Sequence, residues 1–469
     1  MFEMPGADAY FLWEESRARH MHTLKIVVVD PSTAHQKVSF ERVRRGALRV
    51  LPHLPAFRRR PVGIPLGLGH PLWLEAPALE PDRHLRHEVL PLGSGPEALD
   101  DLLGRIASEP LDETRPLWQL FFVEGLPGGR IAYVVKLHHA LADGLASAAL
   151  AVRLFQQTRE PVELPRAWEA ENEPVPPALL RLAHSLRREL ARQRELPLLL
   201  LRSLRSVGVS RRWRASKCAA APRAFTSPLT RFNRTLTPNR ITTHVTLPLA
   251  ALRRVKDAFG CTLNDVYLAI VGGSLRRYLA GRGELPEQAL TAAVPVSVRR
   301  AGEDPAFGNA TAYWFASTGT DRADPAERLA AVAESTRAAR ALFEACDPHL
   351  AVEWLDHWAL RRPYLDGLQT LVTALVGRPS YNVIVSNVRG PSRPLYSDGA
   401  RVEALTSMGP LTRQQGLNFT AWSYLEDFAV GLHACREHVP DLRSLAAALP
   451  EELEALSLAV GSRPGAGAG

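Results

Sequence analysis

Apolar residues recur along the chain in two patterns, short runs rich in β-branched and aromatic residues and longer stretches with helical spacing. The short runs are bounded by turn residues and predict strands. They cover residues 22–30, 117–124, 130–137, 240–247, 290–298, 311–318, 381–386, 419–424 and 428–434. The helical spacing predicts helices over residues 40–51, 145–157, 249–259, 262–279 and 325–345. Helix and strand signals are therefore mixed throughout the chain.

Turn residues and changes of composition divide this pattern into parts. At 469 residues the chain is long enough for two domains or two halves. Residues 1–165 form a first half, residues 166–223 a linker with a basic segment, and residues 224–460 a second half. The Gly- and Ala-rich tail 461–469 is predicted to be disordered.

Composition narrows the class of protein. The apolar share of 46% and the charged share of 23% are ordinary for a soluble globular protein. The start of the chain is acidic and lacks the apolar core of a secretory signal, and no apolar run approaches the length of about 20 residues that a membrane span needs. The four cysteines are far apart and form no C-x-x-C pair, so we expect neither a metal site nor a disulfide framework, and we expect a cytoplasmic location.

The excess positive charge is confined to one segment. Residues 181–217 contain eleven of the 57 Lys and Arg residues and only two acids, whereas the rest of the chain is nearly neutral. Leu182, Leu186 and Leu190 recur there at helical spacing until Pro197 interrupts the pattern. Segment 178–217 therefore predicts a basic amphipathic helix at an anionic membrane or lipid-droplet surface, and not a nucleic-acid site. The alternative, of equal weight, is a helix packed between lobes with its arginines solvated or paired within the protein.

One motif carries chemistry by itself. His138, His139, Asp143 and Gly144 form the pattern His-His-x-x-x-Asp-Gly between a predicted strand and a predicted helix. A neutral imidazole at such a turn can take a proton from a hydroxyl near pH 7, because its usual pKa is about 6.5. Asp143 can orient the loop or the ring, and Gly144 removes a Cβ at a sharp turn. The plainer alternative is a buried structural His138 beside a surface His139.

Further motifs follow in a fixed order and support a family resemblance. They are Pro116-Leu117-Trp118, the His motif, Asn264-Asp265, residues 295–299, Gly308-Asn309 and residues 386–391. With these landmarks the chain resembles the bacterial wax ester synthase/diacylglycerol acyltransferases, which belong to the CoA-dependent acyltransferases. Only the His motif is specific alone, and peptide-synthetase condensation domains share it. Asn264 is equally explained as a helix cap, the Pro-Leu-Trp triplet as ordinary core, and residues 387–391 as a turn.

The resemblance implies a two-lobed α/β fold like that of chloramphenicol acetyltransferase, with a tunnel between the lobes. His139 would lie near the middle of the tunnel as general base. His138 would face away from the acceptor, and Asp143 would act mainly structurally, with Arg299 as a candidate partner. Asn264 is the candidate oxyanion donor. Substrate contacts are assigned to Pro116, Leu117, Trp118, Ser297 and Asn387.

The function implied is long-chain acyl transfer from acyl-CoA, as co-substrate, to a fatty alcohol or a diacylglycerol, with no resident cofactor and no metal. The enzyme would be cytoplasmic and peripheral to the inner face of the membrane or to lipid droplets. One alternative is a condensation-like domain that acts on carrier-bound thioesters, although no carrier or adenylation region is recognisable. The other is a non-catalytic lipid-surface protein, which the intact His139, Asp143 and Gly144 disfavour.

Overall fold

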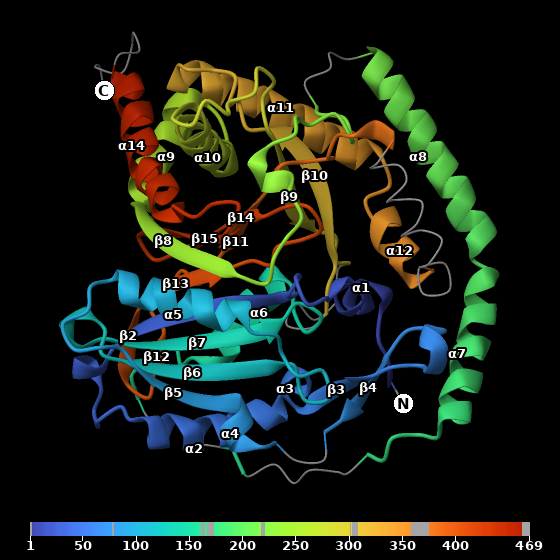
Figure 1. The fold of residues 1–469 in the computed structure, drawn as a ribbon, viewed down its shortest axis with the longest axis vertical. Helices are drawn as coiled ribbons and strands as arrows, with labels where there is room; N and C mark the ends of the chain where they lie inside the picture. The colour runs from blue at the N-terminus through green and yellow to red at the C-terminus, as the bar shows by residue number, and fades with distance from the viewer. Residues whose placement is uncertain are drawn as a thin grey trace.

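Two lobes, each built on a six-stranded sheet, make up the molecule (Figure 1). The computed structural model describes residues 2–76, 79–160, 165–166, 173–216, 221–300, 302, 308–357 and 375–461. The predicted two-lobed α/β fold is confirmed. The predicted linker is described only in part, and of the tail only residue 461 lies among the described residues.

The N-terminal lobe contains a mixed sheet with the strand order β12-β13-β2-β7-β6-β5. Its strands are β2 (His22–Asp30), β5 (Leu85–Val89), β6 (Trp118–Glu124), β7 (Ile131–His138), β12 (Tyr396–Ser397) and β13 (Ala400–Met408). A small sheet joins β1 (Phe2–Glu3), β4 (Leu72–Glu75) and β3 (Arg59–Val62). The helices of this lobe are α1 (Gly6–Glu14), α2 (Phe40–Val50), α3 (Pro55–Arg58), α4 (Pro81–His84), α5 (Glu97–Ser108) and α6 (Gly144–Leu154).

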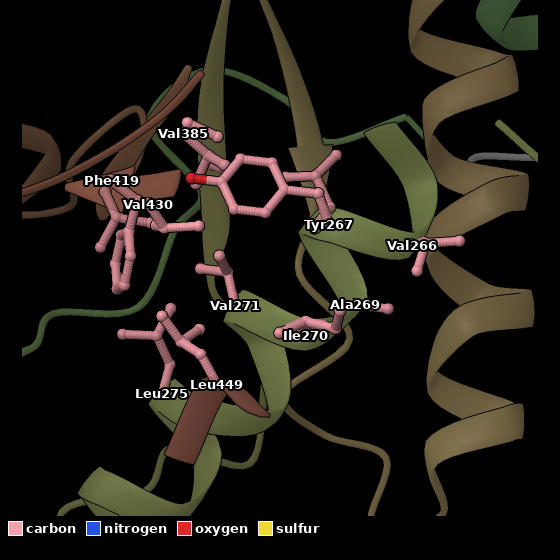
Figure 2. Close-up of a cluster of buried hydrophobic side chains, with 14 of the residues drawn as sticks. Val266, Tyr267, Ala269, Ile270, Val271, Leu275, Val385, Phe419, Val430 and Leu449 are labelled. Carbon is pink, nitrogen blue, oxygen red and sulfur yellow. The ribbon is translucent and has the colours of Figure 1, made fainter. Parts of the chain in front are cut away.

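The C-terminal lobe contains a sheet with the order β10-β9-β11-β14-β15-β8. Its strands are β8 (Arg240–Pro248), β9 (Thr291–Ser297), β10 (Thr311–Ser317), β11 (Val383–Arg389), β14 (Leu417–Tyr424) and β15 (Asp427–Cys435). Its helices are α9 (Leu249–Phe259), α10 (Leu263–Ala280), α11 (Pro325–Ala345), α12 (Leu350–Asp356) and α14 (Leu442–Gly461). The core of this lobe forms where α10 packs its side chains against β11, β14 and β15 (Figure 2).

Part of the second half of the chain belongs to the first lobe. Strand β13 pairs antiparallel with β2, from Arg401 opposite Asp30 to Met408 opposite Leu24, and it brings β12 with it. The prediction of residues 224–460 as a single C-terminal lobe is therefore wrong for residues 396–408. The pairing partner of a short strand is set by the tertiary fold and not by its neighbours in sequence.

The basic segment forms two consecutive helices, α7 (Ala178–Gln193) and α8 (Leu196–Ser216). Pro197 lies in the first turn of α8, where proline is tolerated because the first amides of a helix have no intrahelical partner. The helical pattern that Pro197 interrupts in the sequence thus resumes in a second, longer helix. The two helices run along one side of the molecule, α7 beside the N-terminal lobe and α8 beside the C-terminal lobe (Figure 1).

None of the helices within the described ranges has, taken singly, the length and apolar character that a membrane span requires. Helices α9 and α10, which meet at a bend of 104°, meet that requirement only as a pair.

Candidate active site

The His motif lies where β7 ends and α6 begins, and Asp143 fixes that junction. Its Oδ1 accepts a hydrogen bond from the Ala146 amide at 2.8 Å, which caps the N-terminus of α6. Its Oδ2 accepts from the Arg299 guanidinium at 2.8 Å, the Ala310 amide at 3.1 Å and the Thr311 hydroxyl at 3.2 Å. The predicted partner Arg299 is therefore in place. The Asp143 carboxylate is buried, and it accepts hydrogen bonds from both lobes. It therefore joins the two lobes at the His motif.

Gly144 follows Asp143 as the first residue of α6. A Cβ at this position would lie 3.0 Å from Cγ2 of Val388 on β11. The glycine therefore permits close packing of α6 against the C-terminal lobe, rather than the sharp turn expected from the sequence.

Two contacts hold the ring of His139, one on its face and one at Nδ1. Phe11 of α1 stacks on it with ring centroids 4.1 Å apart. Its Nδ1 lies 3.0 Å from Oδ1 of Asn309, whose Nδ2 donates to Oδ1 of Asp8 at 2.8 Å and to the His139 carbonyl at 2.9 Å. Because the Asn309 amide has both acceptors on its nitrogen side, its oxygen must face the ring. Nδ1 of His139 therefore carries the proton, and Nε2 keeps a lone pair.

Burial also shapes the charge of these groups. Desolvation, with a smaller contribution from the Lys25 ammonium, lowers the pKa of His139 to about 4. The ring is therefore neutral at pH 7 and can accept a proton. Desolvation raises the pKa of Asp8 to about 7, although hydrogen bonds from Asn309 oppose that rise.

His138 has contacts of its own, with neither Phe11 nor Asn309 among the partners of its ring nitrogens. It is 2% exposed, and its Nε2 lies 3.3 Å from Oε2 of Glu15. Its Nδ1 accepts from the Ala140 amide at 3.1 Å. The two nitrogens of His138 are thus occupied by local hydrogen bonds that shape the loop.

A cavity of about 210 Å³ lies between the lobes and contains His139 on its wall. It is also lined by four of the other predicted residues, Asp143, Gly144, Ser297 and Asn387. Further lining side chains come from β2, β10, β11, β13 and β14 and include Thr23, Lys25, Thr311, Tyr313, Ser407, Asn418 and Thr420. The wall beside His139 is therefore rich in hydroxyl and amide groups.

Three of the predicted substrate contacts lie elsewhere. Pro116, Leu117 and Trp118 are buried in the N-terminal lobe and are not among the cavity's lining residues. The Trp118 indole donates to the Phe57 carbonyl at 2.7 Å, and the Leu117 carbonyl accepts from the His138 amide at 3.0 Å. These residues support the His loop from behind, which is the packing alternative left open by the sequence.

The predicted oxyanion donor also lies away from the cavity. Asn264 lies in the first turn of α10 and is absent from the described lining of the cavity. Its neighbour Asp265 forms a capping box with Thr262. The Asn-Asp pair thus lies at the start of a core helix, where these residue types are favoured because they can cap the helix. The position of Asn264 gives no support to a role as oxyanion donor.

Other residues of the site were missed by the sequence analysis. Asn309 was noted only as a landmark, and Asp8, Phe11, Thr23 and Lys25 were given no role at all. Lys25 did carry a signal, since it is the only charged residue in the run between His22 and Asp30. The others become neighbours only through the tertiary fold.

The comparisons with known proteins agree with this geometry. The model of the wax ester synthase/diacylglycerol acyltransferase catalytic domain matches residues 4–267, and that of the family's C-terminal domain matches residues 307–457. A relative from Mycobacterium tuberculosis, provisionally named a diacylglycerol O-acyltransferase, is 32% identical over 461 residues and is covered for 90% of its length by 97% of this chain.

Solved structures extend the likeness to three dimensions. The wax ester synthase/diacylglycerol acyltransferase from Marinobacter aquaeolei VT8 superimposes with a TM-score of 0.71 at 25% identity, covering 98% of this chain and 100% of that one. The first condensation domain of the calcium-dependent antibiotic synthetase shares the fold, with a TM-score of 0.59 at 18% identity over 97% of this chain and 96% of that domain. The chain thus belongs to the wax ester synthase/diacylglycerol acyltransferase family, and it is an acyltransferase.

Proposed function

We propose that this acyltransferase moves a long-chain acyl group from acyl-CoA to the hydroxyl of a fatty alcohol or a diacylglycerol, with His139 as general base. Nε2 of His139 takes the hydroxyl proton as the oxygen attacks the thioester carbonyl. The C–O bond forms, the C–S bond breaks, and the coenzyme A thiolate leaves with the proton that His139 returns. A thiolate is a good leaving group, so this route needs no covalent acyl-enzyme.

The observation that carries the proposal is the state of His139. Its Nδ1–H is directed at Asn309, which leaves the Nε2 lone pair unprotonated at the cavity. The lowered pKa of His139 keeps Nε2 unprotonated at neutral pH. A general base supplies about 10²- to 10⁴-fold of rate, and positioning of the two substrates supplies much of the remainder.

Replacement of His139 tests the proposal directly. In His139→Ala we expect the rate of coenzyme A release from palmitoyl-CoA with hexadecanol or dipalmitoylglycerol to fall at least about 100-fold. The melting temperature should fall only modestly, because the variant loses the contacts with Phe11 and Asn309 but removes a ring that borders an existing cavity. His138→Ala is the matched comparison and should lose less activity but more stability, since it leaves Glu15 without its ring partner. A His139→Ala enzyme that keeps more than about a tenth of the wild-type rate would contradict the general-base role.

The same assay separates the proposal from its alternative. A condensation-like enzyme would need the acyl group on a carrier protein, whereas the proposed enzyme releases coenzyme A from free acyl-CoA. The condensation-domain neighbour shares only the fold at 18% identity, so it gives that alternative no added weight.

We also propose that α7 and α8 place the enzyme on an anionic membrane or lipid-droplet surface at the cytoplasmic side. Leu179, Leu190 and Leu204 are 82%, 70% and 70% exposed on these helices. Exposed arginines accompany them, namely Arg187, Arg194, Arg205, Arg211 and Arg212. A helical surface that combines exposed leucines with arginines suits an interface of lipid tails and anionic headgroups. A neutral-lipid product would enter that surface directly.

A further inference from the structure

Lys25 introduces a positive charge into the wall of the His139 cavity. It lies on β2 between Val135 of β7 and Ser407 of β13. Its Nζ donates to Oγ of Ser407 at 2.9 Å and lies 5.5 Å from the centre of the Trp422 ring. The side chain is among those that line the cavity. An ammonium has three N–H groups, so this one retains hydrogen-bonding capacity toward the cavity.

No carboxylate balances this charge at close range. Among the described residues no ion pair includes Lys25, and Asp143 acts on it only through the longer-range field. Burial lowers the pKa of Lys25 to about 8, so the group is still mainly protonated at pH 7. A cation in such a place is costly unless a partner of opposite charge joins it.

A second polar group beside Lys25 has no hydrogen-bond partner in the described structure. Thr23 lies two residues earlier on the same strand, so both side chains leave the same face of the sheet, about 6.6 Å apart along β2. Thr23 is 3% exposed and lines the same cavity, and its Oγ1 has no hydrogen-bond partner in the described structure. An ammonium and a free hydroxyl donor therefore face one cavity from neighbouring positions. Buried polar groups are rarely left unpaired without a functional reason.

We propose that Lys25 and Thr23 form a subsite for an anionic oxygen group, a carboxylate or a phosphate, carried by the acyl acceptor. This goes beyond the proposed function, whose fatty alcohol and diacylglycerol acceptors are neutral, because it adds hydroxylated anions as a further class of acceptor. It rests on that function for the identification of the ligand as an acceptor. The phosphates of coenzyme A are separated from its thioester by the whole pantetheine arm, so they do not reach a group near His139 when the thioester is bound there.

The strand register sets how far the anion lies from the reacting hydroxyl. Thr23 is opposite Leu137, the residue before His138, and Lys25 is opposite Val135. His139, the proposed base, follows the last residue of β7, so the backbone of Lys25 lies four residue positions from it, about 13 Å along the strand, and the long lysine side chain can cover part of this distance. The Lys25 ammonium is near enough to act on the charge of the His139 ring. The anion is therefore only a few bonds from the hydroxyl, as in a 3-hydroxy acid or a glycerol 3-phosphate ester.

Two matched acceptor pairs test the subsite. One pair is 1-palmitoylglycerol 3-phosphate and 1-palmitoylglycerol, and the other is 3-hydroxyhexadecanoate and its methyl ester. The readout is the ratio of kcat/KM for the anionic member to that for the neutral member, measured by coenzyme A release from palmitoyl-CoA. In Lys25→Met this ratio should fall about tenfold or more, mainly through KM, because a charge-assisted hydrogen bond is lost. Lys25→Arg should retain most of it, and Thr23→Val should lower it less.

The matched control is Lys256→Met, which removes a partly exposed lysine of α9 that pairs with Asp257. It should leave the ratio unchanged. A fall confined to the phosphate pair identifies a phosphate ligand, and one confined to the carboxylate pair identifies a carboxylate. An unchanged ratio in folded Lys25→Met for both pairs overturns the subsite while leaving the acyl transfer intact. Lys25→Gln gives the same comparison should the methionine variant not fold.

A binding measurement separates the two proposals. If the wild-type enzyme acylates neither hexadecanol nor dipalmitoylglycerol, the proposed function fails, and calorimetric titration of monomeric 1-palmitoylglycerol 3-phosphate still tests the subsite. We expect Kd to be about tenfold weaker for Lys25→Met than for the wild type. Equal Kd values would overturn the subsite independently of any activity.

Discussion

His139 owes its protonation state to residues from two other parts of the chain. Asn309 fixes the tautomer, Asp8 fixes Asn309, and Phe11 covers the ring face. The motif alone therefore does not make the base. It supplies the imidazole, and side chains from α1 and from the segment before β10 determine which nitrogen is available.

The low pKa of His139 predicts an unusual pH profile. The groups that act on the ring are Asn309, Lys25, Asp143 and His138, and burial outweighs them. The base is active when neutral, so kcat/KM should rise with pH through about 4 and be near its maximum at pH 5.5. A histidine with the ordinary pKa of about 6.5 would retain only about a tenth of its activity at pH 5.5. The pH dependence of kcat/KM with palmitoyl-CoA and hexadecanol measures this acid limb, the part of the profile in which activity rises with pH.

Replacement of Lys25 tests the same pH profile. Its positive charge disfavours protonation of His139, so Lys25→Met should move the acid limb toward higher pH. Lys256→Met should not move it. A wild-type limb near pH 6.5 would show that His139 is solvated in the working enzyme, contrary to the structure.

At the residue scale, local patterns could predict contacts close in sequence but not distant ones. The one distant contact that was expected, between Asp143 and Arg299, came from the family resemblance. Strand alternation led us to expect that His138 faces away from the acceptor. A mainly structural Asp143 was also expected, but its capping of α6 was not, although an Asp just before a predicted helix is a usual cap. Asp8 reaches Asn309 across 301 residues, a separation that no local pattern can bridge. Lys25 was visible as a lone charge in an apolar strand, but its chemical meaning depended on Ser407 of β13.

Among the elements, α10 shows how a local pattern and a tertiary constraint combine. Its apolar spacing predicted a helix, and the structure buries nearly every face of it, so α10 is the centre of the C-terminal lobe (Figure 2). Such burial requires close approach to neighbours. A Cβ added at Gly272 would lie 1.8 Å from the Thr318 carbonyl oxygen, which is backbone and cannot rotate away.

Gly272→Ala should therefore destabilise the protein despite the better helix propensity of alanine. Overpacking of a core costs about 1–3 kcal/mol and more where backbone must move, whereas alanine offers at most about 1 kcal/mol in return. The matched control is Gly208→Ala on α8, where the added Cβ meets no atom within 4 Å. We expect a lower free energy of unfolding for Gly272→Ala and an unchanged or slightly higher one for Gly208→Ala in urea titrations. Equal values would mean that α10 can shift away from β10 without cost.

The elements missed from the sequence have identifiable causes. Helix α5 carries Leu99, Leu102, Leu103 and Ile106 at helical spacing, so its signal was present and unused. Pro450 interrupts the pattern of α14. Strand β13 contains helix-forming residues in Glu403, Ala404 and Leu405, and its pairing with β2 overrides their preference.

Across the whole molecule, the active site depends on both lobes at once. His139 and Asp143 belong to the first half of the chain, while Arg299, Asn309 and the β11 wall belong to the second. Strand β13 adds Ser407 and strengthens the connection by joining the first lobe's sheet. Groups from both lobes therefore line the cavity that contains His139.

Helices α7 and α8 present a different surface from the one predicted from the sequence. The structure turns several arginines toward the protein, where Arg188 and Arg192 pair with Glu3, and Arg202 pairs with Asp347 and Glu353. Leu182 packs inward, against the cluster of Ile64, Leu72 and Leu74. The alternative of internally paired arginines is thus correct for these three, while the most exposed leucines remain uncovered in the described structure.

We expect the exposed leucines and the exposed arginines of α7 and α8 to contribute differently to binding of anionic liposomes, which flotation measures. Changing Leu179, Leu190 and Leu204 together to Gln should abolish flotation at all salt concentrations, because insertion of apolar side chains is not screened. Changing Arg187, Arg194 and Arg205 to Gln should weaken flotation mainly at low salt, since each arginine near an anionic surface contributes about 1 kcal/mol. The control changes the exposed leucines Leu92, Leu229 and Leu458 to Gln, which lie outside these helices and should have no effect. Binding that survives the α7–α8 leucine changes, or that the control weakens equally, would show that these helices are not the lipid-facing surface.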